Sequence, residues 1–418
     1  MNKLIIALLF VSVSCFGFTF KFDGWIEYDF DKPTDLTKFS VIVPFMGTTF
    51  TASGGFKRDN QVIPPYAEKL WYNYWYWDEG YFEWRNEFFS IEAGVKQNSV
   101  GPGQIYKLFV AENGFSYPSV HSTASLGRFR VETLWGGLRF VETGTKPLKA
   151  FNYRSLIFSP FDGFEIAYQE SVLYLKRVFD PYYFFIPIPI PGIQEFWHLP
   201  APWAYSTDEM DDNSMIGGWI RYSADNYSVY SDILIDDINM NRFLNPEGFQ
   251  NPDKIAFLVG FTGKSGPYKV TFEVAGATAF TFERSTAIRP YEYVYFENSN
   301  LPIESNMIGY RHGENNIACS IALEYSNSGW SISALYEGLI YGTRTPGSPW
   351  HGGTIPSGTH WLIGDVKSQF SFKGRVGYTF KDLPKYLGER LTVGFRFGFI
   401  GEKPFVGFDL SSVVDVNM

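Results

Sequence analysis

The sequence predicts an all-β fold: a single antiparallel transmembrane β-barrel of about 16 to 18 strands, preceded by a cleaved signal peptide. Three observations support this fold class: an aromatic-rich composition, a period-two alternation of apolar and polar residues, and an N-terminal export signal. A membrane-crossing strand needs about 10 residues. The strand number follows from the roughly 400 residues after the signal, with turns and loops included.

The composition favours strands over helices. Phe, Tyr and Trp make up 19% of the 418 residues, and charged residues make up another 19%. Phe and Tyr carry much of the apolar fraction, which suits strands with one apolar and one polar face. This aromatic content is too high for a disordered chain, and it argues against a mainly helical enzyme.

The charge and the cysteines exclude further classes. The formal net charge of -9 at pH 7 argues against a broad nucleic-acid surface, so we expect no nucleic-acid partner. Cys15 lies in the expected signal peptide, which leaves Cys319 alone in the mature chain. A single thiol makes no internal disulfide, so none is expected.

The N-terminus resembles a secretory signal. Lys3 precedes an uncharged apolar run that ends at Gly17. A basic start, an apolar run and small residues are typical of export signals, and this run is too short to cross a membrane as a helix. Cleavage after Ser14 or after Gly17 fits the pattern. We take residues 1–17 as the signal and 18–418 as the barrel.

The alternation is clearest toward the C-terminus. In residues 392–399 the odd-numbered positions are Val and Phe, whereas the even-numbered positions are Thr, Gly and Arg; residues 268–275, 319–325 and 370–380 repeat the scheme. A soluble sandwich also alternates, but it turns its apolar face to a core. Large aromatics on one face, small and charged residues on the other, and the lack of a linker favour a barrel in lipid. Such a sheet must close, because every backbone group needs a partner there.

The polar faces of these strands predict a charged lumen. The residues expected to line it are Arg128, Arg130, Arg139, Arg221, Lys269, Glu273, Glu324, Glu337, Lys373, Arg375 and Arg396, with Glu132, Asp232 and Asp236 as further inward acids. Bases and acids are close to balance, so they can form ion pairs across a narrow space. This pattern favours a filled or constricted barrel over a wide ion-selective pore.

Three segments interrupt the regular pattern. Residues 180–213 are rich in Pro and aromatics before they turn acidic, and residues 342–358 hold further Pro, Trp and His residues. We expect both loops to fold over or into the barrel mouth, because apolar loops are unfavourable in water. Residues 44–55 are expected to form a bent or broken strand.

No catalytic or metal-binding pattern stands out. Residues 260–265 end like a phosphate-binding loop, but Leu258 occupies a position where that motif requires Gly. The histidines lack metal-ligand spacing. Adjacent acids such as Asp211 and Asp212 would point to opposite faces of a strand. We therefore expect no catalytic residue, no cofactor and no metal.

An aromatic run between residues 71 and 77 allows two interpretations. Trp71, Trp75 and Trp77 share one face of a strand, and the tyrosines between them take the other face. One interpretation is an aromatic girdle at the membrane interface. The other is a platform on which the apolar faces of sugars stack.

Several short strings occur in a characteristic order between about residues 90 and 345. They are Gly94-Val95-Lys96, Gly101-Pro102-Gly103, Leu108, Asn113 and Pro118; Tyr153-Arg154-Ser155-Leu156 with Pro160; Phe164-Glu165-Ile166-Ala167 with Glu170; Asp212-Asn213-Ser214; and Tyr230 through Asp236-Asp237. This series resembles the Wzi-type capsule-assembly family of outer-membrane proteins. Two features depart from that family: no helical segment precedes the first strand, and the chain does not end in an aromatic residue.

The resemblance implies an 18-stranded barrel in the bacterial outer membrane that attaches surface polysaccharide without catalysis. The expected partners are outer-membrane lipid, surface polysaccharide and the barrel-assembly machinery. The polysaccharide-binding candidates are Trp71, Trp75, Trp77, Trp197, Trp203, Trp350, Arg154, Asn213 and Asp236. A porin or substrate channel is the alternative function. An outer-membrane hydrolase would need a Ser/His or metal constellation, which the spacing does not supply.

Overall fold

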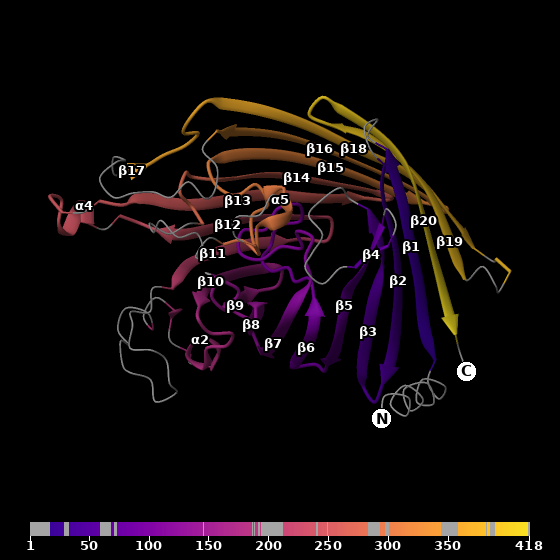
Figure 1. Cartoon of the computed structure of the whole chain (residues 1–418), viewed down its shortest axis with the longest axis horizontal. Helices are drawn as coiled ribbons and strands as arrows, with labels where there is room; N and C mark the ends of the chain where they lie inside the picture. The colour runs from indigo at the N-terminus through magenta and orange to yellow at the C-terminus, as the bar shows by residue number, and fades with distance from the viewer. Residues whose placement is uncertain are drawn as a thin grey trace.

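The protein folds as a closed antiparallel β-barrel (Figure 1). The computed structural model describes residues 17–28, 33–58, 68–70, 73–144, 146–185, 187, 189–190, 193, 212–239, 241–248, 250–282, 293–296, 301–343, 358–381, 383–384 and 389–416. Within them, β4 (Glu68–Leu70) and β17 (Gly358–Thr359) are short additions, and the other 18 strands close the barrel. The predicted antiparallel barrel is confirmed, at the upper end of the predicted strand number, and the signal peptide stays a prediction.

The barrel strands follow one another around the ring in chain order. Their bounds are β1 (Phe18–Tyr28), β2 (Pro33–Phe45), β3 (Thr48–Arg58), β5 (Asn73–Arg85), β6 (Phe89–Lys96), β7 (Tyr117–Leu126), β8 (Phe129–Arg139), β9 (Lys149–Phe161), β10 (Phe164–Leu175), β11 (Asn213–Ser223), β12 (Tyr227–Asp237), β13 (Pro252–Ser265), β14 (Tyr268–Ala277), β15 (Asn316–Asn327), β16 (Trp330–Gly342), β18 (Val366–Lys381), β19 (Arg390–Ile400) and β20 (Lys403–Val416).

The first and last strands close the ring. β1 and β20 pair antiparallel from Phe18 with Val416 to Tyr28 with Val406, and the indigo strand lies beside the yellow one in Figure 1. Closure gives each of the 18 barrel strands two neighbours. It therefore meets the requirement that no sheet edge is exposed to lipid.

Side chains alternate between an apolar outer face and a polar inner face. On β19, Val393 and Phe395 are exposed on the outside. Arg396, between Phe395 and the next outward residue, turns inward, with its Nη1 atom 3.5 Å from Oε2 of Glu27 on β1. The outer face is thus the apolar belt that a transmembrane barrel presents to lipid.

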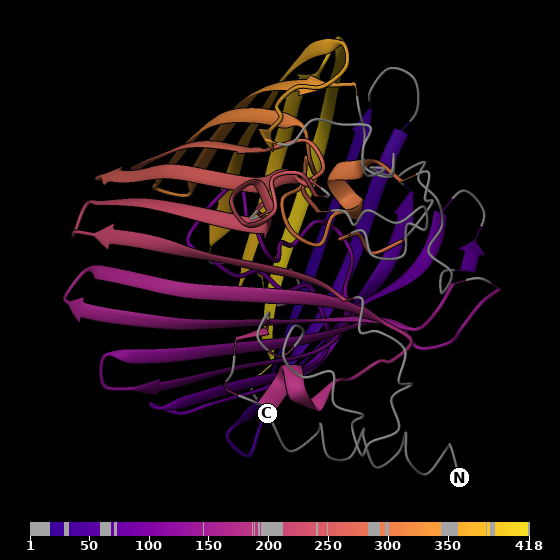
Figure 2. The same cartoon turned by 90° about the vertical axis from the view of Figure 1, so that its left-hand side faces the viewer.

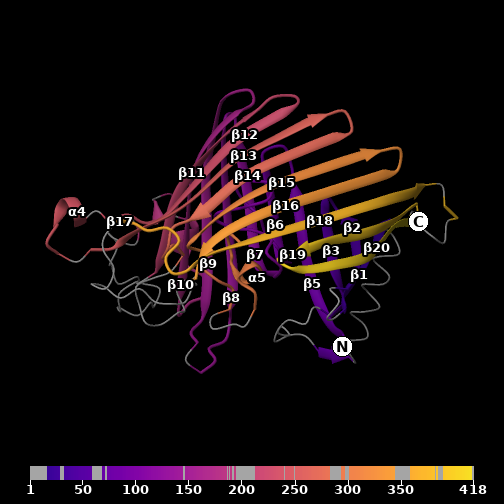
Figure 3. The same ribbon diagram turned by 90° about the horizontal axis from the view of Figure 1, so that it is seen from above.

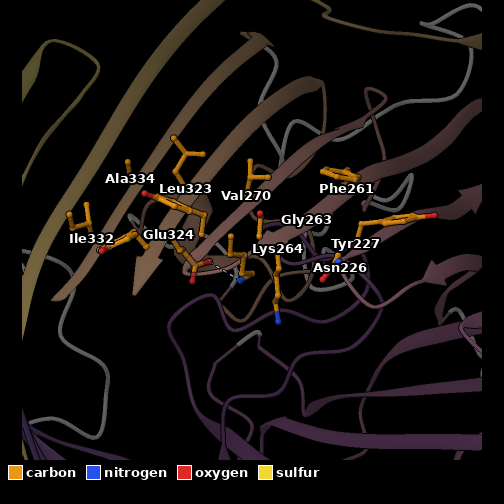
Figure 4. Close-up of a pocket in the computed structure, with 14 residues that line it drawn as sticks. Asn226, Tyr227, Phe261, Gly263, Lys264, Val270, Leu323, Glu324, Ile332 and Ala334 are labelled. Carbon is orange, nitrogen blue, oxygen red and sulfur yellow. Dashed lines mark hydrogen bonds and ion pairs between the residues drawn. The ribbon is translucent and has the colours of Figure 1, made fainter. Parts of the chain in front are cut away.

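Figure 4 shows the same alternation around a hollow of about 860 Å³ beside β12 to β16. Phe261 and Leu323 point to one side of the sheet, whereas the head groups of Lys264 and Glu324 point to the other. The apolar rim of this hollow lies on the outer face. It belongs to the lipid-facing surface.

The two ends of the barrel differ. At the short-turn end, strands are joined by tight turns such as 127–128, 266–267 and 328–329, and these hairpins project together in Figure 3. At the long-loop end, the connections include 97–116 and 278–315. Barrels of this class have short periplasmic turns and longer extracellular loops.

One turn corrects an expectation from the sequence. Residues 44–55 do not form a bent or broken strand, because β2 ends at Phe45 and β3 begins at Thr48. The intervening Met46 and Gly47 have φ values of 48° and 78°, which suit a two-residue hairpin turn. Methionine is unusual at such a position, so the pair lacks a recognisable turn signature.

Within the described ranges, short helices lie between the strands at the long-loop end: α2 (Pro181–Phe185), α4 (Asn241–Leu244) and α5 (Ile303–Asn306). α4 projects away from the strands in Figures 1 and 3. α5 lies inside the ring of strands in Figure 2. Among the described residues, no helix has the length and apolar character to cross a membrane.

Candidate functional site

Two long connections fold into the lumen. The first plug segment, residues 97–116, joins β6 to β7, and the second, within residues 278–315, joins β14 to β15. We call them together the plug. Neither segment was predicted from the sequence to enter the lumen. Other loops, at 180–213 and 342–358, were expected to fold over the mouth.

The two plug segments bond to each other. The backbone N–H of Ala111 donates to the carbonyl of Ile308 at 2.8 Å. The side-chain amide of Asn113 donates to the carbonyls of Met307 and Gly309 at 2.8 and 2.6 Å. Backbone groups that leave water need new hydrogen-bond partners. Each plug segment supplies such partners to the other.

A single carboxylate on β14 anchors the first plug segment. Glu273 is fully buried and accepts the backbone N–H groups of Gln104, Ile105 and Tyr106 at 2.5, 3.0 and 2.8 Å. The hydroxyl of Tyr230 donates to the same carboxylate at 2.7 Å. Four donors offset the cost of removing the charge from water.

Glu337 on β16 forms a second anchor. Its Oε2 atom accepts the hydroxyl of Tyr106 at 2.6 Å and the guanidinium of Arg311, so it contacts both plug segments. His312 and Ser320 lie 3.2 and 3.3 Å from the same oxygen. Because these bonds involve ionised groups, they are stronger than neutral ones.

Further polar contacts tie the second segment to the barrel. The buried Lys149 ammonium donates to the carbonyl of Val294 at 2.6 Å. Asp236 on β12 accepts the backbone N–H of Phe282 at 3.0 Å. Asp236, a polysaccharide-binding candidate from the sequence, therefore faces the lumen and contacts the plug.

The plug and the wall from β7 to β16 share one apolar core. Phe109 of the plug lies 5.9 Å, between ring centroids, from Tyr153 of β9. The largest part of the buried set comprises Val100, Tyr106, Leu108, Phe109, Val110, Tyr293, Ile308 and Tyr310 of the plug, with Phe151, Tyr153, Leu173, Tyr230, Leu258, Ala275 and Ala318 of the strands. We call these strands the plugged wall. The plug therefore packs directly against the lumen side of these strands.

Part of the family-like series of short strings is the first plug segment itself. A Cβ atom at Gly103 would lie 2.0 Å from the carbonyl oxygen of Tyr106, and one at Gly309 would lie 2.1 Å from that of Leu108. Both positions exclude any larger residue unless the backbone moves. The plug therefore needs Gly103 and Gly309 to pack closely, and it needs Asn113 to bond its two segments.

The other side of the lumen carries charge. We call β18 to β20 with β1 to β5 the free wall. Arg375 pairs with Asp409 at 2.6 Å, and Lys38 pairs with Asp78 at 2.5 Å. These ion pairs run along the wall. The plug, which was not predicted, occupies the other side of the lumen.

Most predicted luminal charges lie on the inner face. They are Arg130, Arg221, Lys269, Glu273, Glu324, Glu337, Lys373, Arg375 and Arg396, with Glu132, Asp232 and Asp236. Two assignments are corrected. Arg128 occupies an exposed turn, and Arg139 ends β8 beside a register shift and donates to the carbonyl of Pro147 at 2.9 Å. The alternation of inward and outward side chains does not predict where a side chain points once the strand has ended.

The aromatic run on β5 divides as predicted between two faces. Trp75 and Trp77 make an edge contact at 5.4 Å between ring centroids, and Trp77 is 68% exposed. Tyr74, on the opposite face, is buried. The tryptophans thus lie on the outer face, as a girdle requires. Sugar binding by them remains a prediction, and Trp71 lies outside the described residues.

The other polysaccharide-binding candidates are scattered. Trp197, Trp203 and Trp350 lie outside the described residues. Asn213 is buried at the start of β11. Arg154 pairs with Glu170 on the outer face of β9 and β10. The structure does not bring the described candidates together.

The described part of the loop after β10 covers that ion pair. Tyr183 and Ile190 pack against Val172 and Tyr174 on the outer face of the barrel. The backbone N–H of Ile190 donates to Glu170 at 2.7 Å. This part of the loop therefore packs on the outer wall, whereas residues 194–211 lie outside the described ranges.

A buried charge network holds the base of this loop. Arg177 contacts Asp180 at 2.8 Å and Asp212 at 2.6 Å, and the hydroxyl of Tyr183 donates to Asp212 at 2.8 Å. Burial raises the pKa of the Asp180 carboxyl above its ordinary value, and the neighbouring Arg177 opposes that rise. The network joins the two ends of the loop, because Asp180 follows β10 and Asp212 precedes β11.

Exposed aromatic rings gather beside this network at the long-loop end. Phe179 lies 6.2 Å from Trp135 and 5.5 Å from Phe184, and Phe184 lies 4.9 Å from Phe185, all between ring centroids. Phe185 is 70% exposed. Sequence reasoning missed this group, because Trp135 comes from β8 and the phenylalanines come from the loop after β10.

The comparisons with known proteins concern the fold. No family model and no curated protein matches the sequence. Among solved structures, the Escherichia coli protein Wzi, an outer-membrane protein involved in group 1 capsule assembly and a carbohydrate-binding β-barrel, has a TM-score of 0.59 and 11% identity, over 99% of this chain and 88% of that chain.

Pseudomonas aeruginosa OpdK, solved with vanillate, has a TM-score of 0.50 and 9% identity, over 97% of this chain and 99% of that chain. OprD from the same organism has a TM-score of 0.49 and 9% identity, with 97% of each chain covered. The protein is a bacterial outer-membrane β-barrel. At these identities the likeness shows the fold alone, and the relationship to the Wzi-type family is a distant structural one.

Within the described residues, no group of three or more His, Cys, Asp or Glu side chains could hold a metal ion. The carboxylates of Glu273 and Glu337 accept hydrogen bonds from the plug.

Proposed function

We propose that this barrel binds or anchors surface polysaccharide at its long-loop end, without catalysis. The observation that supports this function most directly is the plug, which Glu273 holds through three backbone N–H groups. A lumen filled in this way is poorly suited to wide diffusion. It is well suited to support a rigid outer surface.

The contacts would come from aromatic side chains of the outer loops. The predicted loop residues Trp203 and Trp350 supply rings that can stack on the apolar faces of sugars. The described aromatic group around Phe179 lies at the same end of the barrel and extends that surface. By the usual asymmetry of outer-membrane barrels, this end faces outward. Outer-membrane lipid and the barrel-assembly machinery would be the remaining partners.

The test measures polysaccharide retention on cells that express Trp203→Ala and Trp350→Ala variants. We expect weaker retention with normal assembly of the barrel. Trp330→Ala is the matched control, because Trp330 is 49% exposed and lies at the short-turn end. Retention equal to wild type in both loop variants would remove these loops from the proposal.

A substrate channel is the second candidate. Its support is the free wall, where charged side chains such as Arg375 face the lumen beside the plug. The distant similarity to OpdK, solved with vanillate, adds to the case. Planar-bilayer recording separates the two functions. A folded but electrically silent barrel supports anchoring, whereas large steady conductance proportional to salt supports the channel.

A further inference from the structure

A second, smaller hollow lies inside the barrel, between the plug and strands β14 to β20. Its volume is about 490 Å³, which is within the range of small-molecule sites. The plug contributes Gln104 and Arg311, and the strands contribute Lys269, Lys373 and Arg396 among others.

The hollow is unevenly charged. Five bases line it, Lys269, Arg311, Lys373, Arg375 and Arg396, and the single acid among its lining residues is Glu324. In the part of the chain that the structure describes, no ion pair of Lys373 is found, although the other four bases each contact an acid. Among the described residues, the ammonium of Lys373 thus has no acidic partner, and it lies beside the guanidinium groups that line the same hollow.

A ligand could reach this hollow from the short-turn end. A neighbouring hollow of about 350 Å³ shares Gln104 and Lys269 with it. That second hollow also includes Asp225 and Asn226, in the tight turn between β11 and β12. It adds Lys264 and Arg221 to the lining, of which Arg221 pairs with Glu165.

We propose that the hollow at Lys373 binds a small organic anion, a carboxylate- or phosphate-bearing molecule about the size of a sugar. Lys373 would bind the anion directly, because it has three donors and no acidic partner among the described residues. Arg311 and Arg396 would hold the negative charge in place from the plug and from β19. This site is separate from the polysaccharide surface, which would lie at the opposite end of the barrel.

The test titrates detergent-solubilised protein with glucuronate, glucose 1-phosphate and glucose by isothermal calorimetry. We expect at least one of the two anions to bind at 1:1 stoichiometry and glucose not to bind. Binding of glucuronate alone identifies a carboxylate ligand, and binding of glucose 1-phosphate alone identifies a phosphate ligand. No binding of either anion, or equal binding of glucose, overturns the proposal.

Variants of Lys373 test whether this residue binds the anion. Lys373→Gln should weaken anion binding by about tenfold or more, whereas Lys373→Arg should retain it. Lys367→Gln is the matched control, because Lys367 lies on the same strand and the same face, outside the hollow. Anion binding by Lys373→Gln equal to that of wild type would also overturn the proposal. None of these measurements depends on polysaccharide retention.

Discussion

The plugged wall and the free wall use their inward positions differently. The plugged wall presents small side chains such as Ala256, Ala275 and Ala318, all fully buried, which let the plug approach closely. The free wall presents long bases such as Lys373 and Arg396. The same barrel therefore has a protein core on one side and a charged, solvent-accessible surface on the other.

Two inward acids of the plugged wall bind different partners. Glu324 lies opposite Lys269 in the strand register, and the two form an ion pair. Glu273 lies opposite Gly260 and Ser320, so no basic neighbour is available. It binds backbone N–H groups of the plug instead. The carboxylate of Glu273 is thus free of a cross-strand ion pair and holds the first plug segment.

The largest expected effect comes from Glu273→Ala, which would release the first plug segment from the plugged wall. Three backbone N–H groups and the Tyr230 hydroxyl would lose their acceptor, at about 1–3 kcal/mol for each donor left unsatisfied. We expect the first plug segment to detach and the barrel to show new conductance steps in planar bilayers. Glu324→Ala is the control. Its carboxylate is half exposed and contacts Lys269, so that variant should conduct like wild type.

A smaller effect is expected from Gly103→Ala, which tests close packing in the plug. The added methyl group would meet the carbonyl of Tyr106 at 2.0 Å, and overpacking of this kind costs about 1–3 kcal/mol. Hydrogen exchange should become faster at plug amides such as Ala111 and unchanged in the barrel strands. Gly80→Ala serves as the comparison, because a methyl group added there would meet no atom within 4 Å. Equal exchange in both variants would mean that the plug tolerates displacement.

The smallest effect is expected from Arg396→Gln on the free wall. Its pair with Glu27 spans 3.5 Å, and both side chains are partly exposed, so the loss should lie within about 0–1 kcal/mol. The urea midpoint of unfolding should shift little, and conductance should match wild type. A large loss of stability in this variant would show that the free wall depends on its ion pairs as strongly as the plugged wall depends on the plug.

The sequence predicted the barrel and most inward residues well, because alternation is a local property of each strand. Arg375, Arg396 and Glu273 were assigned to the lumen only from the alternating pattern of the residues next to them in the sequence. Errors arose where local rules end. Arg128 lies in a turn, Arg139 ends a strand, and the hairpin at Met46 lacks a turn signature.

What the sequence determined by itself is the closed transmembrane sheet, since period-two patterning and the exclusion of unpaired backbone from lipid leave few other folds. The tertiary structure alone decided how the lumen is used. Glu273 and Gln104 are 169 residues apart, and no local pattern links them. Their bond forms only because closure of the barrel brings β14 beside the segment after β6, where a buried carboxylate requires donors.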